Sequence, residues 1–252
     1  HTDARSPGLT VRQPMSINRP ASDGIVIDPT ASPNTTITTT IVAEAKGSHM
    51  LEYACKPALM FILSSWFFFN SRRYGDRFTL MIQLGLFFSL IGDVALMFVH
   101  LDEFNFLIGL AAFLIAQLCY AMAFIHNIME TGPARGTWIS ALLGVVLITF
   151  GYFFASSLMP YLDEYVVVPI VIYTVAICLM GVSAAFRLGR TYIKSFAYVF
   201  IGALLFITSD SILATNTFHH PLDHAKWSVI LTYAVAQVLI ASGALRHVLD
   251  PE

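Results

Sequence analysis

From residue 51 onward, long apolar segments of the chain alternate with short polar ones. Seven apolar segments have roughly the length that a helix needs to cross a bilayer. They are approximately residues 54–69, 78–99, 104–126, 137–156, 165–186, 193–216 and 227–247. The connections contain ten residues or fewer, so neighbouring helices should be antiparallel. The pattern predicts an all-α fold, a polytopic transmembrane helix bundle with seven spans.

Residues 1–50 have a different character. They are polar, rich in Thr, Pro, Ser and Asp, and contain no apolar core of a signal peptide. Such a segment has too little apolar surface to offset the entropy of ordering, so we expect it to be disordered. Gly47-Ser48-His49-Met50 also resembles a cloning scar. The prediction is therefore an N-terminal segment, 1–50, that is disordered or foreign to the fold, and a single transmembrane helical domain, 51–252.

Composition supports the membrane assignment. Of the 252 residues, 56% are hydrophobic and only 12% are charged, which is typical of integral membrane proteins. The net charge of −2 says nothing about partners, and no basic block suggests binding to nucleic acid. Cys55, Cys119 and Cys178 lie in or beside apolar segments without the paired spacing of a zinc site or a disulfide framework. We interpret them as buried free thiols.

The distribution of charge predicts an orientation. Alternate loops, their flanking helix ends and the C-terminal region carry Arg72, Arg73, Arg77, Arg135, Arg187, Arg190, Lys194 and Arg246, whereas the opposite loops carry Lys226 with Asp102, Glu103, Asp163, Glu164 and Asp223. By the positive-inside rule, the first set and the C-terminus face the cytoplasm. We expect an integral membrane protein of the endoplasmic reticulum with a cytoplasmic C-terminus.

Two aspartates interrupt the apolar pattern. Asp93 is the only charge in residues 82–98, and Asp210 is the only charge in residues 198–214. In both segments, the positions eight, four and one before the aspartate and three after it share its helical face and include small residues. A carboxyl at the centre of a membrane helix costs about 2.5–3.5 kcal/mol on insertion scales, so such residues are usually functional.

The two aspartates fall in the second and sixth predicted spans, which run parallel, and they lie at similar depth. If the two carboxyls meet in low dielectric, they cannot both ionise easily, and one remains an acid beside a base. Such a pair can protonate a substrate and activate water, or it can relay protons or cations across a membrane. The alternative is structural: each aspartate holds the bundle together by hydrogen bonds between helices.

Other polar side chains at helical depth are candidates for the same site. Singly, most are more typical of packing or of the membrane interface than of a binding site. They are Lys56, Ser89, Gln117, Tyr120, Tyr173, Asn216, Tyr233 and Gln237. His100, His219, His220 and His224 lie near the mouth of the bundle without metal-ligand spacing, so no metal is predicted.

Six stretches of the sequence form a recognisable set. They are Lys56-Pro57, GLFFSLIGDVALM (85–97), GLAAFLIAQLCYAMAF (109–124), PIVIY (169–173), GALLFITSDSILATNTF (202–218) and YAVAQVLIA (233–241). Together they resemble the lysoplasmalogenase family, the YhhN-like membrane proteins. The resemblance implies hydrolysis of the vinyl ether bond of lysoplasmalogens to a fatty aldehyde and a glycerophospho-base. It implies a lysophospholipid substrate drawn from the lipid bilayer and no cofactor. A homodimer is compatible with it.

The resemblance also implies roles for individual residues. Asp93 and Asp210 become the catalytic pair, and Lys56, Tyr120, Tyr233 and Gln237 become pocket residues. We count Ser89, Gln117, Tyr173 and Asn216 as further substrate-binding candidates. The sequence departs from the family pattern in two respects. Family members commonly have a histidine where Gln117 stands, and they usually have eight spans rather than seven.

Three other functions remain open at this stage. A transporter or channel would use the same aspartates as a proton or cation relay. A seven-helix receptor is compatible with the span count, although the last predicted span lacks a lysine for retinal. An inactive relative would bind lipid without cleaving it, which the Gln117 departure would fit.

Overall fold

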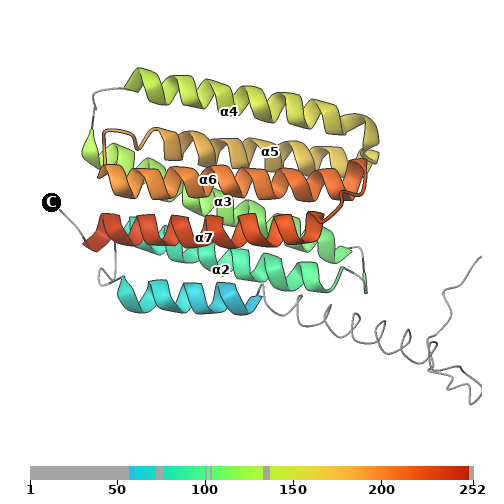
Figure 1. The fold of residues 1–252 in the computed structure, drawn as a ribbon, viewed down its shortest axis with the longest axis horizontal. Coiled ribbons are helices and arrows are strands. Elements are labelled where there is room, and N and C mark those ends of the chain that lie inside the picture. Colours follow the sequence, from blue (N-terminus) through green and yellow to red (C-terminus); the bar gives the residue numbers. More distant parts are fainter. Residues whose placement is uncertain (1–56, 72–75, 100, 103, 133–136, 250–252) are drawn as a thin grey trace, which may run out of the picture. The chain divides into compact units, whose positions relative to one another are not determined.

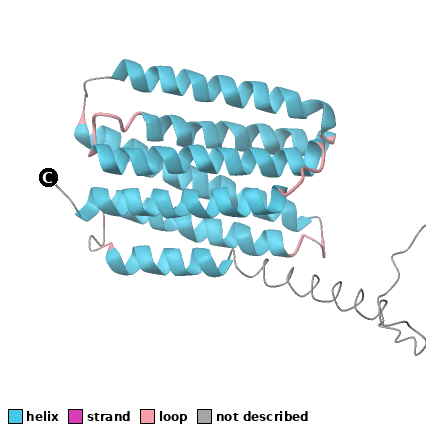
Figure 2. Cartoon of the chain, viewed as in Figure 1, coloured by secondary structure: helices cyan, strands magenta, loops and turns pink. Residues whose placement is uncertain are grey.

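The computed structural model describes residues 57–71, 76–99, 101–102, 104–132 and 137–249, all of which belong to one compact unit. This described part of the chain is helical and contains no strand (Figure 2). The all-α fold is therefore confirmed. The predicted disorder of residues 1–50 lies outside the described residues and stays a prediction.

Within the described ranges, six helices are long and apolar enough to cross a membrane. They are α2 (Arg77–Met97), α3 (Phe104–Thr131), α4 (Thr137–Leu158), α5 (Glu164–Ala185), α6 (Ile193–Ala214) and α7 (Ala225–Leu249). A 3-10 turn, η1 (Met159–Tyr161), follows α4, and a π-helical turn, η2 (Thr215–His219), follows α6. The first predicted span is helical over Pro57–Asn70, a shorter apolar helix among the described residues.

Five of the long helices form a closed ring. The packing contacts run from α2 to α3, from α3 to α5, from α5 to α6, from α6 to α7, and from α7 back to α2. In Figure 1, α4 forms an outer edge of the bundle, and its main partner is α5. The helix Pro57–Asn70 lies against α2, where Gln83 Nε2 donates to Ser64 Oγ at 2.7 Å. The side chains that meet inside the ring therefore come from helices far apart in sequence.

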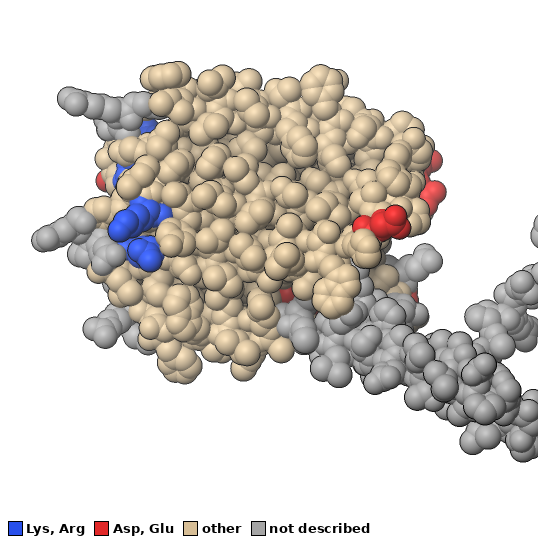
Figure 3. Space-filling model, in the orientation of Figure 1, with Lys and Arg blue, Asp and Glu red and all other residues tan. Residues whose placement is uncertain are grey.

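The two ends of the bundle carry opposite charge, as Figure 3 shows. At the end where α7 finishes lie Arg77, Arg187, Arg190, Lys194 and Arg246, and at the other end lie Asp102, Asp163, Glu164 and Asp223. We call these the basic end and the acidic end. Asp76 and Glu130 also lie at the basic end, so the separation is a bias rather than an absolute one. The polarity expected from the sequence is present.

A buried arginine joins several helices at the basic end. Arg187 follows α5 and has no exposed surface. Its Nε donates to Asn127 Oδ1 on α3 at 3.0 Å, and its Nη2 donates to Ser195 Oγ on α6 at 3.1 Å. The guanidinium also lies over the rings of Phe78 and Phe124. Burial lowers the pKa of Arg187 to about 9, so the side chain is still charged at neutral pH.

Candidate functional site

Two pairs of polar side chains connect α2 to α7 at adjacent turns. Tyr233 donates its hydroxyl to Asp93 Oδ2 at 2.9 Å, and Gln237 Nε2 donates to Ser89 Oγ at 2.9 Å. Each helix contributes residues four positions apart, so both pairs lie on the facing sides of the helices. All four side chains are buried. Asp93 is therefore held among side chains rather than in solvent.

Tyr120 extends this network to α3. Its hydroxyl donates to Gln237 Oε1 at 2.7 Å, so the Gln237 amide both accepts and donates within the bundle. The absence of a side chain at Gly85 makes room for the Tyr120 ring, because a Cβ built at Gly85 would lie 2.3 Å from that ring. The glycine in the first aspartate motif thus has a packing function at this site.

Asp210 lies in a second network, formed with α3 and α5. Gln117 Nε2 donates to Asp210 Oδ2 at 3.0 Å, and the Tyr173 hydroxyl donates to the same oxygen at 2.5 Å. Gln117 is completely buried, whereas Asp210 and Tyr173 keep some exposed surface. Two neutral donors therefore orient the Asp210 carboxyl by hydrogen bonds to one of its two oxygens.

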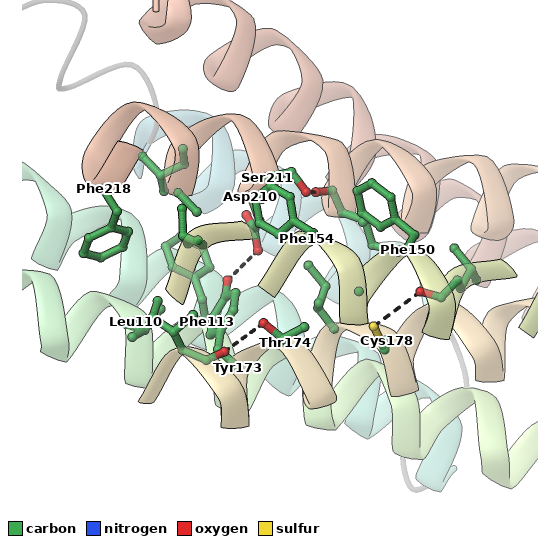
Figure 4. Close-up of a pocket in the computed structure, with 18 of the residues that line it drawn as sticks. Leu110, Phe113, Phe150, Phe154, Tyr173, Thr174, Cys178, Asp210, Ser211 and Phe218 are labelled. Atoms are coloured by element: carbon green, nitrogen blue, oxygen red, sulfur yellow. Dashed lines mark hydrogen bonds between the residues drawn. The ribbon is translucent and has the colours of Figure 1, made fainter. Parts of the chain in front are cut away.

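The exposed surface of Asp210 faces a narrow cavity of about 70 Å³ between α3, α4, α5 and α6 (Figure 4). Most of its lining is apolar, including Leu110, Phe113, Leu147, Phe150, Phe154, Leu158, Ile170, Ile177 and Ile207. Two hydroxyls in the wall bond back to their own helices: Thr174 Oγ1 donates to Ile170 O, and Ser211 Oγ donates to Ile207 O. The cavity therefore presents one carboxyl, with Tyr173 beside it, to an otherwise hydrocarbon-like space.

Asp93 is not among the residues that line this cavity. A chain of contacts nevertheless leads to it, because the cavity-lining ring of Phe113 lies edge-on to Tyr233, with centroids 5.8 Å apart. Tyr233 in turn bonds to Asp93. Phe206 completes a cluster with the other two rings. Asp210 thus meets the cavity directly, and Asp93 is linked to its wall through aromatic side chains.

The structure brings most of the predicted site residues together in these two networks: Ser89, Asp93, Gln117, Tyr120, Tyr173, Asp210, Tyr233 and Gln237. Asn216 does not join them. It is exposed in η2, where its side-chain oxygen accepts a hydrogen bond from the Leu222 backbone N–H. Lys56 lies outside the described residues. Cys119 is a buried free thiol as expected, while Cys178 is free but only partly buried.

The sequence interpretation did not identify the apolar wall of the cavity or the contribution of α4 to it. Phe150, Gly151 and Phe154 of α4 line the cavity, yet they show no polar signal in the sequence. The one sequence feature that could have indicated the cavity is Gly151, which has no side chain and lies within a run of large residues.

His219 and His220 are exposed neighbours that contact each other at the end of η2. Among the described residues, the group able to place three ligand atoms within 4.8 Å of one another is instead Asp76, His126 and Glu130. That group lies at the basic end and is partly exposed. It is therefore separate from the cavity that Asp210 lines.

These features define a polytopic helical membrane protein with carboxyl groups buried in its interior. The profile of the YhhN family matches residues 51–244, and the chain belongs to that family. A rat protein named lysoplasmalogenase TMEM86B is 30% identical over 192 residues, covering 76% of this chain and 71% of its own. The human TMEM86B lysoplasmalogenase is 30% identical over 195 residues, or 76% of this chain and 74% of its own.

A more distant relative is bacterial. A protein of Mycobacterium bovis named lysoplasmalogenase is 27% identical over 139 residues, covering 55% of this chain and 50% of its own. No solved structure gives a significant match to the chain.

Proposed function

We propose that this protein hydrolyses the vinyl ether bond of lysoplasmalogens, with Asp210 acting directly on the substrate and Asp93 as the second essential carboxyl. The enzyme class rests on the family and on the relatives, which make the protein a membrane-embedded hydrolase of the lysoplasmalogenase type. The observation that carries the assignment to residues is the Asp210 carboxyl in the wall of an otherwise apolar cavity.

The shape and polarity of the cavity fit a single hydrocarbon chain better than a hydrated ion. Asp210 lies four residues before the end of α6, near the acidic end, and the cavity continues past Ile207 to Leu147 and Ile177. An alkenyl chain lying along this apolar wall would place its polar end toward the acidic end. The positively charged amine of an ethanolamine or choline head group complements the carboxylates there.

The chemistry requires a proton donor and a proton acceptor. A protonated Asp210 gives its proton to the vinyl carbon remote from the ether oxygen, which produces an oxocarbenium ion. The two hydrogen bonds that Oδ2 of Asp210 accepts hold the carboxyl in place for this transfer. Water then adds to the cation and returns a proton to a carboxylate. The hemiacetal that results collapses to the fatty aldehyde and the glycerophospho-alcohol.

Asp93 acts in this proposal through charge and position. As an ionised carboxylate it stabilises the cation, and Tyr233 fixes its orientation. Gln117 donates to Asp210 but cannot exchange protons as an imidazole does, so proton handling falls to the carboxyls. The activity should have a bell-shaped pH dependence, because one carboxyl must be protonated while the other is ionised.

The test replaces each aspartate separately, by Asp93→Asn and Asp210→Asn, in purified protein supplied with lysoplasmalogen. Asparagine nearly matches aspartate in size and keeps an oxygen for Tyr233 or Tyr173, but it can neither ionise nor donate a carboxylic proton. Each variant should lose about 10²–10⁴-fold of aldehyde release, the usual contribution of one general acid or base.

Two control variants separate catalysis from support of the site. Ser89→Ala and Tyr233→Phe should cause smaller losses than the asparagine variants, because they remove hydrogen bonds and no carboxyl. Folding is checked by elution as a monodisperse peak and by thermal unfolding. A monodisperse asparagine variant with undiminished aldehyde release would return that aspartate to a structural role. No aldehyde from the unmodified protein would favour the transporter or the inactive lipid binder.

A further inference from the structure

A second hollow lies on the outer, lipid-facing side of the bundle, between α4 and α5. This groove has a volume of about 470 Å³. Its lining is almost wholly apolar, and several of its side chains are strongly exposed, among them Ile148, Tyr152, Met159, Val175 and Leu179. In a bilayer these side chains contact hydrocarbon, so the groove is filled by lipid chains rather than by water.

The outer groove and the inner cavity share part of their wall. Gly151 on α4 and Thr174 and Cys178 on α5 line both. At this point the barrier has no side chain on the α4 side, because position 151 is glycine and a Cβ there would lie 2.3 Å from Cys178 Sγ. Figure 4 shows Thr174 and Cys178 on the wall near Asp210. At this point the wall between the outer groove and the Asp210 cavity is therefore formed by the backbone of Gly151 and the side chains of Thr174 and Cys178.

The α4 helix is also weakly held across this partition. Its main packing partner among the long helices is α5, and it has the smallest buried share of the six spans. In the described part of the chain, the polar contact that crosses the seam between the two helices is from Cys178 Sγ to Leu147 O at 3.7 Å. A thiol is a weak donor, so separating the helices here breaks little besides apolar contacts that lipid can replace.

We infer that the α4–α5 seam at Gly151 and Cys178 is a lateral portal through which the hydrocarbon chain of the substrate passes from the bilayer to the Asp210 cavity. This inference rests on the proposed function and adds the route and the part of the lipid that takes it. The chain lies first in the outer groove, and the seam then opens around Gly151. The vinyl ether follows the chain inward until it meets Asp210.

A reversible clamp on the seam tests the portal. Gly151→Cys places a thiol against the native Cys178, at a separation that small side-chain adjustments bring within disulfide reach. Oxidation then joins α4 to α5, and a reductant releases them. The oxidised variant should release aldehyde from a long-chain lysoplasmalogen more than about tenfold more slowly than the same sample after reduction, because closing a gate blocks passage.

A second substrate distinguishes the portal from the chemistry. A water-soluble lysoplasmalogen analogue with a four-carbon alkenyl chain does not need the outer groove, so both redox forms should cleave it at similar rates. The matched control is Gly151→Cys combined with Cys178→Ser, which cannot form the clamp and should show no redox effect on either substrate. Equal long-chain rates in the clamped and reduced forms would overturn the portal.

Photocrosslinking does not depend on catalysis, so it tests the portal even if the protein does not cleave lysoplasmalogen. A lysophospholipid with a photoreactive group at the end of its chain should crosslink to the cavity in the reduced variant and much less in the clamped one. Equal crosslinking would also overturn the portal, whether or not aldehyde is released. If Gly151→Cys does not fold, Gly144→Cys with Val182→Cys in a Cys178→Ser background provides another clamp, because a Cβ at Gly144 lies 3.4 Å from Val182 Cγ1.

Discussion

Asp210 receives two hydrogen bonds on the same oxygen, from Gln117 on α3 and from Tyr173 on α5. Tyr173 lies in the cavity wall, so its hydroxyl holds the carboxyl at the place where substrate would react. Tyr173→Phe removes that donor and keeps the ring. Asp210 becomes a carboxylate as it gives up its proton, and a hydrogen bond to a charged group contributes about 1.5–3 kcal/mol. The kcat for aldehyde release should therefore fall about 10- to 100-fold.

The comparison variant for this prediction is Tyr198→Phe. Tyr198 lies toward the basic end of α6, where its ring faces Arg246, and phenylalanine preserves that ring contact. Steady-state kinetics in detergent or bilayer discs measure both variants. If Tyr173→Phe changed only KM, the hydroxyl would bind substrate rather than orient Asp210, and the proposed arrangement would need revision.

At the residue scale, helical periodicity correctly predicted which side chains face inward. Gly85, Ser89 and Asp93 form one buried strip on α2, and Gly202 and Phe206 are buried ahead of Asp210 on α6. The difference between the two aspartates was not predictable. Whether a carboxyl lines a cavity depends on which apolar side chains of other helices cover it, and no local pattern in the sequence records those contacts.

The contact between α2 and α3 depends on a glycine. Gly85→Ala places a methyl group within the space of the Tyr120 ring, which is completely buried and bonded to Gln237. The ring must move, and the hydrogen-bond network of α2, α3 and α7 moves with it. We expect the variant to lose about 1–3 kcal/mol of stability, as overpacked cores do, and to unfold at a lower temperature.

A second glycine provides the comparison at the same scale. A Cβ at Gly144 on α4 would meet Val182 at 3.4 Å, which is ordinary contact. Gly144→Ala should therefore leave the melting temperature unchanged or raise it slightly, because alanine is favoured over glycine inside a helix. Thermal unfolding of the two variants in the same detergent tests the difference. An equal effect of both alanines would show that helix propensity, rather than the Tyr120 contact, governs Gly85.

The existence and order of the helices were predictable because apolar runs are local features, but their ends were less so. The sequence placed the end of the third span at residue 126, whereas α3 continues to Thr131. The added turn contains Asn127, which is polar in sequence yet buried in the structure because it accepts a hydrogen bond from Arg187. The last turn of α3 thus contains a polar residue whose hydrogen-bond partner lies 60 residues away, which the apolar pattern does not record.

For the whole molecule, short connections predicted antiparallel neighbours but not the closure of the ring. The contacts of α3 with α5 and of α7 with α2 join helices that are not consecutive in the chain, and they leave α4 on the outside. This arrangement places one wall of the Asp210 cavity on a peripheral helix. The hydrogen-bond networks around Asp93 and Asp210 thus belong to helices of the ring. The proposed portal lies at α4, the helix outside the ring.

Orientation in the membrane is the remaining property of the whole molecule, and the charge bias predicts it. Arg187, Arg190, Lys194 and Arg246 lie near the basic end, where α7 also finishes. The carboxylates Asp76 and Glu130 at that end do not offset this, because acidic residues contribute little to orientation. In sealed microsomes, protease added outside should remove a C-terminal tag. The same tag inserted after Asp223, before α7, should be protected until detergent opens the membrane. The reverse pattern would invert the proposed topology, and digestion of both tags would show that α7 does not cross the bilayer.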